Sequence, residues 1–84
     1  MKYEIIITSQ ALKDMKRIKL AGLQNKVENL LDAIIINPFQ TPPTYEKLSG
    51  HNNRYSRRIN SKHRLIYEID ENTIKIIRMW THYE

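Results

Sequence analysis

The chain of 84 residues contains no cysteine, only two glycines and three prolines, and no long apolar run. Without cysteine there is no disulfide framework, no thiolate nucleophile and no thiolate ligand for a metal. The scarcity of glycine and proline argues against a disordered or low-complexity chain. No stretch approaches the roughly 20 apolar residues of a membrane span, and the N-terminal apolar run is too short for a signal peptide. We therefore expect a cytoplasmic protein with a single domain over residues 1–84 and no membrane partner.

The positive charge of the chain is concentrated in residues 46–64. This segment holds one carboxylate, Glu46, and six cationic side chains, which are Lys47, Arg54, Arg57, Arg58, Lys62 and Arg64. Its net charge of +5 equals that of the entire chain, so the remaining residues are neutral in sum. Such a concentration is typical of a surface that binds a polyanion. A solvated charged face, an acidic protein partner and an anionic membrane surface are the alternatives.

The N-terminal half of the sequence predicts one strand followed by two helices. Residues 2–8 form a β-branched run that is too short for a helix and is typical of a strand. Ser9 can cap a first helix that ends near Gly22, and Asn37-Pro38 ends a second one. Their apolar residues at helical spacing are Leu12, Met15 and Ile18, and then Val27, Leu30, Leu31, Ile34 and Ile35. We interpret both stripes as core faces that pack against a sheet.

The C-terminal half changes to a period of two residues. Residues 40–44 contain Pro42-Pro43 and predict a loop. The predicted strands beyond it are residues 54–59, 63–69 and 73–80, with turns at 60–62 and 70–72. The resulting order, β-α-α-β-β-β, predicts an α+β domain in which a helical hairpin packs on one face of an antiparallel sheet.

Strand alternation divides the cationic residues between the two faces of this sheet. The side chains expected to meet the helices are Tyr55, Arg57, Ile59, Leu65, Tyr67 and Ile69. Those expected on the opposite face are Arg54, Ser56, Arg58, Arg64, Ile66 and Glu68. The helix-free face is therefore predicted to be the basic one, with Arg58 on the binding surface and Arg57 paired on the helix side.

Two ionisable residues outside the arginines could take part in chemistry. Glu46 is the sole acid in the most basic segment, where neighbouring guanidinium groups favour its charged form and let it accept a proton. His82 has a side chain whose ordinary pKa, about 6.5, suits an acid or a base at neutral pH. The alternatives are an ordinary surface carboxylate and an exposed terminal imidazole. Likewise, Trp80 and Tyr83 can either pack or stack on unpaired bases.

The sequence carries no recognisable metal or phosphate-loop motif. The three histidines, His51, His63 and His82, do not stand at ligand spacing from one another or from a pair of carboxylates. There is also no glycine-rich phosphate loop and no helix-turn-helix pattern with a basic second helix. We therefore predict no metal site and no cofactor.

Three short runs stand out when they are considered together. They are Tyr55-Ser56-Arg57-Arg58-Ile59-Asn60, His63-Arg64-Leu65-Ile66-Tyr67 and the terminal His82-Tyr83. With Glu46 in a proline-rich loop and with the predicted element order, they resemble the YoeB/Txe toxins of the RelE/ParE superfamily. Members of that family are toxins of bacterial type II toxin–antitoxin pairs and cleave mRNA in the ribosomal A site. The resemblance covers nearly the whole chain.

Matching positions give the residues their implied roles. The resemblance implies that Glu46 is the general base, that Arg64 stabilises the phosphate, and that His82 is the general acid. The 2′-hydroxyl of the RNA would be the nucleophile, so the reaction needs no metal. Tyr83 matches a terminal tyrosine that helps to hold the substrate. The other residues expected to bind substrate are Lys47, Arg58, Arg54 and Tyr55.

The resemblance also implies the partners. We expect the ribosome and mRNA, and a cognate antitoxin of the YefM/Axe type whose acidic segment covers the basic face; a homodimer is compatible with the family. Two other functions remain open for the same fold, since fold does not fix function. One is a ParE-like inhibitor of DNA gyrase, and the other is a non-catalytic module that binds RNA or DNA.

Overall fold

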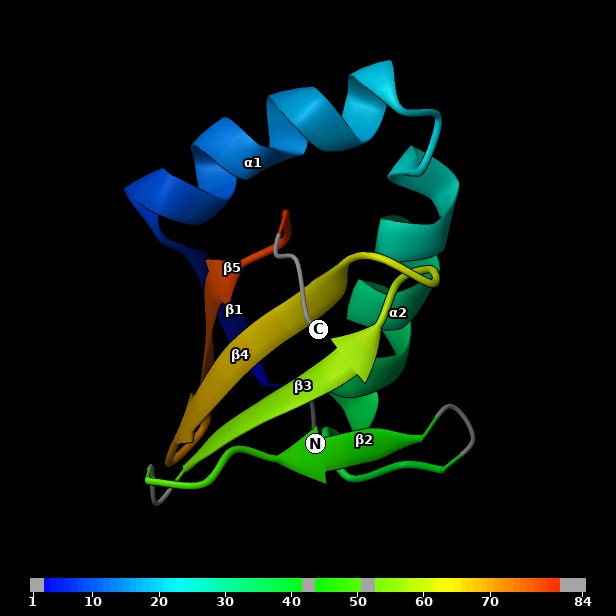
Figure 1. The fold of residues 1–84 in the computed structure, drawn as a ribbon. Helices are drawn as coiled ribbons and strands as arrows, with labels where there is room; N and C mark the ends of the chain where they lie inside the picture. The colour runs from blue at the N-terminus through cyan, green and yellow to red at the C-terminus, as the bar shows by residue number, and fades with distance from the viewer. Residues whose placement is uncertain (1–2, 42–43, 51–52, 81–84) are drawn as a thin grey trace.

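The computed structural model describes residues 3–41, 44–50 and 53–80, which form a five-stranded sheet and two helices (Figure 1). In chain order the elements are β1 (Glu4–Ile7), α1 (Ser9–Leu20), α2 (Gln24–Ile36), β2 (Tyr45–Lys47), β3 (Arg54–Arg58), β4 (Arg64–Asp70) and β5 (Thr73–Arg78). The predicted α+β class and the predicted sequence of strand, two helices and later strands are confirmed. None of the helices in the described ranges is long and apolar enough to span a membrane.

The sheet differs from the predicted one in two respects. Its strand order is β1-β5-β4-β3-β2, and β1 runs parallel to β5, so the sheet is mixed rather than wholly antiparallel. The second difference is the added strand β2, which pairs with β3 and carries Glu46, a residue expected in a loop. Three residues with two exposed charges show no alternating apolar pattern, so their sequence could not predict a strand.

Helix α1 begins and ends with local signals. The Thr8 side chain, one residue before the predicted cap at Ser9, accepts a hydrogen bond from the Ala11 N–H. Its hydroxyl also donates to the Ile76 carbonyl at 2.8 Å, which ties the helix start to β5. At the other end Gly22 adopts a φ of +73°, a conformation that favours glycine and turns the chain into α2.

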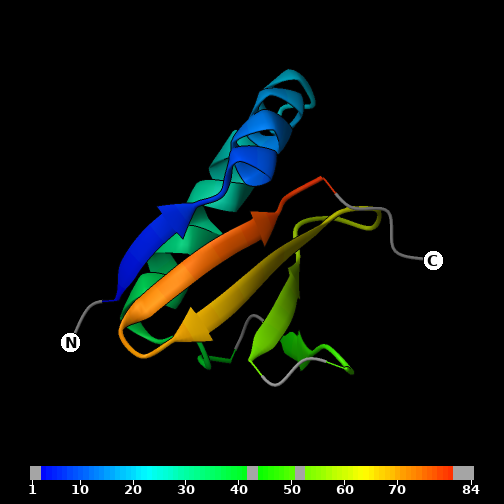
Figure 2. The same cartoon turned by 90° about the vertical axis from the view of Figure 1, so that its left-hand side faces the viewer.

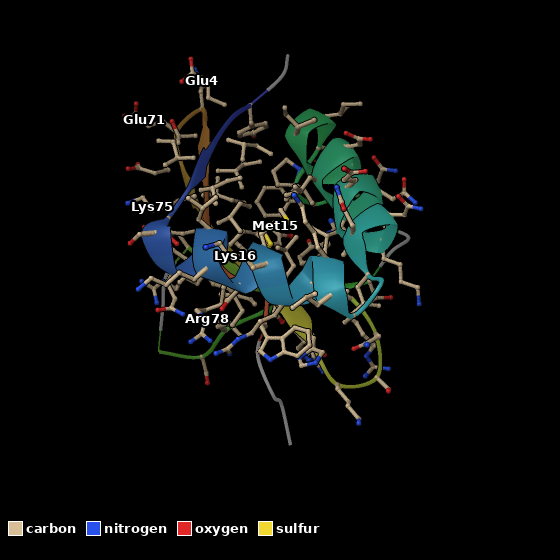
Figure 3. The ribbon with its side chains drawn as sticks, turned by 90° about the horizontal axis from the view of Figure 1, so that it is seen from above. Glu4, Met15, Lys16, Glu71, Lys75 and Arg78 are labelled. Atoms are coloured by element: carbon tan, nitrogen blue, oxygen red, sulfur yellow. The ribbon has the colours of Figure 1, made fainter. Side chains whose placement is uncertain are left out.

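Both helices cover the same face of the sheet, and the core lies between the two layers (Figures 1 and 2). The buried apolar side chains come from α1, α2, β4, β5 and the residues that directly follow β3 and β5, and are Ala11, Ile18, Val27, Leu30, Ile34, Ile59, Leu65, Tyr67, Ile74, Ile76 and Met79. Figure 3 shows Met15 pointing from α1 into this interior. Leu65 and Tyr67 therefore face the helices as alternation predicted.

One arginine is fully buried on the helix side of the sheet. Arg57 donates from Nε to the Tyr67 hydroxyl at 3.1 Å and from Nη2 to the Pro38 carbonyl at 2.9 Å. The Tyr67 hydroxyl donates to the same carbonyl at 2.9 Å, and the guanidinium lies 5.2 Å from the centre of the Tyr45 ring. These contacts fasten the segment between α2 and β2 to the sheet. The predicted pairing of Arg57 on the helix side is confirmed.

Candidate active site

The helix-free face of β2, β3 and β4 contains a pocket of about 360 Å³. Its lining residues are Thr44, Glu46, Ser56, Arg58 and Arg64. The strand register explains this gathering, because Glu46 stands opposite Ser56 and Arg58 stands opposite Arg64. Directly opposed residues on paired strands point to the same face. Residues distant in sequence thus converge on one surface.

An ion pair between Arg64 and Glu46 crosses the pocket. Arg64 Nη1 donates to Glu46 Oε1 at 3.1 Å, and the exposed fractions of the two side chains are 17% and 64%. Pairs this open to solvent contribute only about 0–1 kcal/mol to stability, so the fold does not depend on this one. The geometry instead holds a carboxylate and a guanidinium side by side, with the carboxylate accessible from the pocket.

Ser56 is a pocket residue to which the sequence analysis assigned no role. Its side chain is buried beneath the ion pair, and its Oγ lies 3.5 Å from Arg64 Nη1. The residue belongs to the run 55–60 and alternates in phase with Arg58, which is the signal that could have identified it. We assign Ser56 the role of supporting the Arg64 side chain.

Arg58 brings a second cation to the pocket. It stands directly opposite Arg64 on the neighbouring strand and is exposed. Like charges at directly opposed positions destabilise a sheet. The arrangement is unfavourable for the fold by itself, and an anion bound between the two guanidinium groups would offset it. The pocket therefore has the electrostatics of an anion site with a carboxylate at its edge.

Three residues expected to bind substrate lie elsewhere. Arg54 is on the same face as the pocket but outside its lining, and its Nε forms an ion pair with Glu68 at 2.9 Å. Lys47 and Tyr55 are opposed to each other in the register, on the face of their strands away from Glu46. The Tyr55 ring packs on the helix side against Phe39, Tyr45 and Tyr67. The structure does not bring these three residues into the pocket.

The predicted acid His82 and the predicted substrate ligand Tyr83 lie outside the described residues. The chain is described as far as Trp80, whose ring stacks on His63 with a centroid distance of 3.8 Å and an interplanar angle of 22°. His63 directly precedes Arg64, so the end of the described chain is fastened close to the start of β4. Within the described ranges, no three metal-ligating side chains lie together.

Several solved structures share this fold. The YoeB dimer from Staphylococcus aureus has a TM-score of 0.85 and 36% sequence identity, with coverage of 99% of this chain and 100% of that one. A YoeB–YefM complex from the same organism gives 0.81 and 34%, with the same coverage of both chains. The Escherichia coli DinJ–YafQ complex gives 0.85 at 22% identity over 98% and 94% of the chains, a likeness of fold alone. The fold is thus one that toxins of toxin–antitoxin pairs adopt.

The sequence identifies the family within this class. A family model described as YoeB-like toxin of bacterial type II toxin-antitoxin system matches residues 8–83. The toxin YoeB of Synechocystis sp. is 38% identical over 66 residues, which are 74% of this chain and 73% of that protein. The chain therefore belongs to the YoeB-like toxins of bacterial type II toxin–antitoxin systems. The resemblance stated from the sequence is confirmed.

Proposed function

We propose that this toxin is a ribosome-dependent endoribonuclease that cleaves mRNA in the A site and so inhibits translation. The observation that carries the proposal is the Glu46–Arg64 ion pair, set in an exposed pocket beside Arg58. Membership of the YoeB-like toxin family supports the proposal, because the pocket then belongs to a toxin of a toxin–antitoxin system. A ribosomal target also places the protein in the cytoplasm.

The reaction uses three side chains and no metal. Glu46 accepts the proton of a ribose 2′-hydroxyl, and the resulting oxygen forms a bond to the adjacent phosphorus. The bond from phosphorus to the 5′-oxygen breaks, and His82 donates a proton to that oxygen. The products are a 2′,3′-cyclic phosphate and a 5′-hydroxyl. Arg64 stabilises the negative charge that develops on the phosphoryl oxygens.

The ion pair suits this sequence of events. A guanidinium carries five N–H donors, so Arg64 can bind a phosphate while it still contacts Glu46. Arg58, on the opposing strand, supplies a second positive charge for the scissile phosphate or for its neighbour.

The test measures cleavage of an mRNA on programmed ribosomes by primer extension, with purified protein. Glu46→Ala, Arg64→Ala and His82→Ala should each lower the cleavage rate by about 100-fold or more, the range of general acid–base catalysis. Each should also relieve growth inhibition on induction. The matched control is Glu68→Ala, which breaks an ion pair on the same face but outside the pocket and should keep activity close to wild type.

The same experiment separates the alternative functions. If the three variants remain folded and cleave as fast as the wild-type protein, the catalytic assignment is wrong. A gyrase inhibitor would arrest replication before translation on induction, and a pure binding module would cut no mRNA. Either result would contradict the proposal.

We further propose that an antitoxin with an acidic segment covers the pocket face, and that the toxin can form a homodimer. The net charge of +5 and its concentration near the pocket favour an acidic partner. YoeB of Staphylococcus aureus forms a dimer in one solved structure and a complex with YefM in another. Antitoxin binding should block cleavage and should weaken with rising salt.

A further inference from the structure

A second hollow borders the candidate active site, between α2 and the end of β3. It has a volume of about 220 Å³, and its lining residues are Lys26, Asn29, Leu30, Arg58 and Ile59. We call it the α2 pocket. Figure 1 shows the end of β3 next to α2. Arg58 also lines the pocket of Glu46 and Arg64. The two hollows therefore meet at one guanidinium group, and the proposed reaction uses only one of them.

The α2 pocket has an apolar floor and a polar rim. Leu30 and Ile59 are 8% and 5% exposed and form the floor. The rim consists of the exposed side chains of Lys26, Asn29 and Arg58. Two positive charges and a neutral amide thus surround a small apolar surface. A nucleotide has matching features, because it combines an anionic phosphate, polar hydroxyls and base edges with the flat faces of its base.

The fold gives the charge of Lys26 no electrostatic partner among the described residues. Lys26 takes part in none of the ion pairs of the described ranges. The positions three and four residues to either side hold no acid, and are Gly22, Leu23, Asn29 and Leu30. Lys26 also stands in the first turn of α2, where the helix dipole disfavours a cation. Stabilisation of the helix therefore does not account for this lysine, and its charge is available to a ligand.

The continuity of the two hollows favours RNA as that ligand. Single-stranded RNA carries a phosphate at every nucleotide, so a chain with its scissile phosphate between Arg58 and Arg64 has another phosphate next to it. From Arg58 the chain can continue toward Lys26 at the rim of the α2 pocket. Proteins that bind single strands commonly combine a positively charged groove along the backbone with surfaces for the bases. An acidic protein segment is the alternative occupant.

We propose that the α2 pocket is a binding subsite for the nucleotide next to the scissile phosphate. Lys26 and Arg58 bind the phosphate of that nucleotide. Asn29 forms a hydrogen bond with its ribose or base, since an amide can both donate and accept. Leu30 and Ile59 contact the apolar face. The inference rests on the proposed function, because it takes RNA to be the substrate in the adjoining pocket.

The first measurement is a salt titration of RNA binding in the His82→Ala background, where the RNA stays intact. For single strands, each phosphate neutralised contributes about 0.7 to the slope of log K against log salt. With a hexanucleotide, Lys26→Ala should lower the slope by about that amount. A dinucleoside monophosphate has no neighbouring phosphate. Lys26→Ala should therefore change neither its affinity nor its slope.

Two matched controls come from the same chain. Lys16→Ala removes the same charge from an exposed position of α1 that lines neither pocket, and should leave the slope close to that of the parent protein. Asn29→Ala removes an amide but no charge, so it should weaken hexanucleotide binding without changing the slope. Asn25→Ala makes the same change at an exposed position of α2 outside the pocket and should have no effect. All four positions are exposed, where substitutions change stability little.

The outcomes separate the possible occupants and the two proposals. If Lys26→Ala and Lys16→Ala change hexanucleotide binding equally, the inference is wrong. If Lys26→Ala weakens binding of poly-glutamate but not of the hexanucleotide, the occupant is an acidic protein segment, which also overturns the inference. If the wild-type protein cleaves no mRNA on programmed ribosomes, the proposed function fails instead, and the binding comparison still tests the subsite separately.

Discussion

The arginines of β3 and of the start of β4 differ in their partners, and the partner decides what each charge can do. Arg57 is buried and bonded to neutral oxygens, so its charge supports the fold. The charge of Arg54 is paired with Glu68 at 2.9 Å. Arg58 and Arg64 face each other in the pocket, where their charges are available to a phosphate. A basic segment thus contains structural, paired and site-forming cations.

At the residue scale, the acid stability of the fold should depend on Asp14, a buried carboxylate of α1. Burial raises its pKa, but hydrogen bonds from Met79, Arg78 and Trp80 outweigh this effect and leave the folded-state pKa below the ordinary value of 3.8. The stabilisation by Asp14 is therefore fully present above about pH 4 and is lost as the pH falls through the folded-state pKa. Urea unfolding from pH 7 down to pH 2 should show this decrease in the free energy of unfolding. Asp14→Asn should lack this part of the pH dependence, and an unchanged profile would contradict the assignment.

At the element scale, β2 carries the proposed base but depends on its surroundings for its position. It is a three-residue edge strand that pairs only with β3 among the described residues. On the helix side the Arg57 guanidinium lies over Tyr45, and the Tyr67 hydroxyl and Arg57 share the Pro38 carbonyl. This buried network anchors the segment that leads into β2, and so it contributes to the placement of Glu46.

Removal of one oxygen atom tests the anchoring network. Tyr67→Phe removes the hydroxyl that accepts from Arg57 Nε and donates to the Pro38 carbonyl. The buried, charged Arg57 guanidinium then lacks one of its hydrogen-bond acceptors. The free energy of unfolding should fall by about 1–3 kcal/mol. Tyr55→Phe makes the same chemical change within the same aromatic cluster and should stay within about 0.5 kcal/mol of wild type. Urea denaturation measures both, and equal effects would argue against the network.

The elements also show what the sequence could predict. Alternation placed Arg57 and Tyr67 with the helices and Arg58 and Arg64 on the open face, because strand geometry is local and has a strict period of two. The parallel pairing of β1 with β5 could not be predicted, since β5 is apolar on both faces and does not indicate its neighbours. The Asp14 contact was equally invisible, because no periodicity relates a helical carboxylate to donors more than 60 residues away.

The same reasoning applies to the candidate site. Glu46 and Arg64 entered the prediction through a family resemblance, and the structure places them 3.1 Å apart. Ser56 had no signal beyond its phase with Arg58. Tyr55 was expected to bind substrate although alternation had already placed it on the helix side, and the structure confirms that side. Lys47 stands opposite Tyr55 in the register of β2 against β3 and so shares its face, which the sequence of β2 did not indicate.

At the scale of the whole molecule, both helices lie on one side of the sheet, and among the described residues no helix covers the opposite face (Figure 2). The pocket occupies the β2–β4 side of this face, and the Arg54–Glu68 ion pair lies beyond it. The net charge of +5 attracts RNA to the molecule as a whole. A cation can exchange its counterion for an RNA phosphate if it has no carboxylate partner within the described ranges, as Arg58, or if it has further N–H donors, as Arg64.

This distinction makes salt dependence a test of which cations bind RNA. For single-stranded RNA, each phosphate neutralised contributes about 0.7 to the slope of log K against log salt. Measured with a short RNA in the His82→Ala background, Arg58→Ala should lower the slope by about that amount. Arg54→Ala should lower it much less, because Glu68 already neutralises Arg54. Equal reductions would mean that RNA contacts the whole open face; a selective effect of Arg58 would confine the phosphate contact on this face to the pocket, where Arg58 and Arg64 face each other.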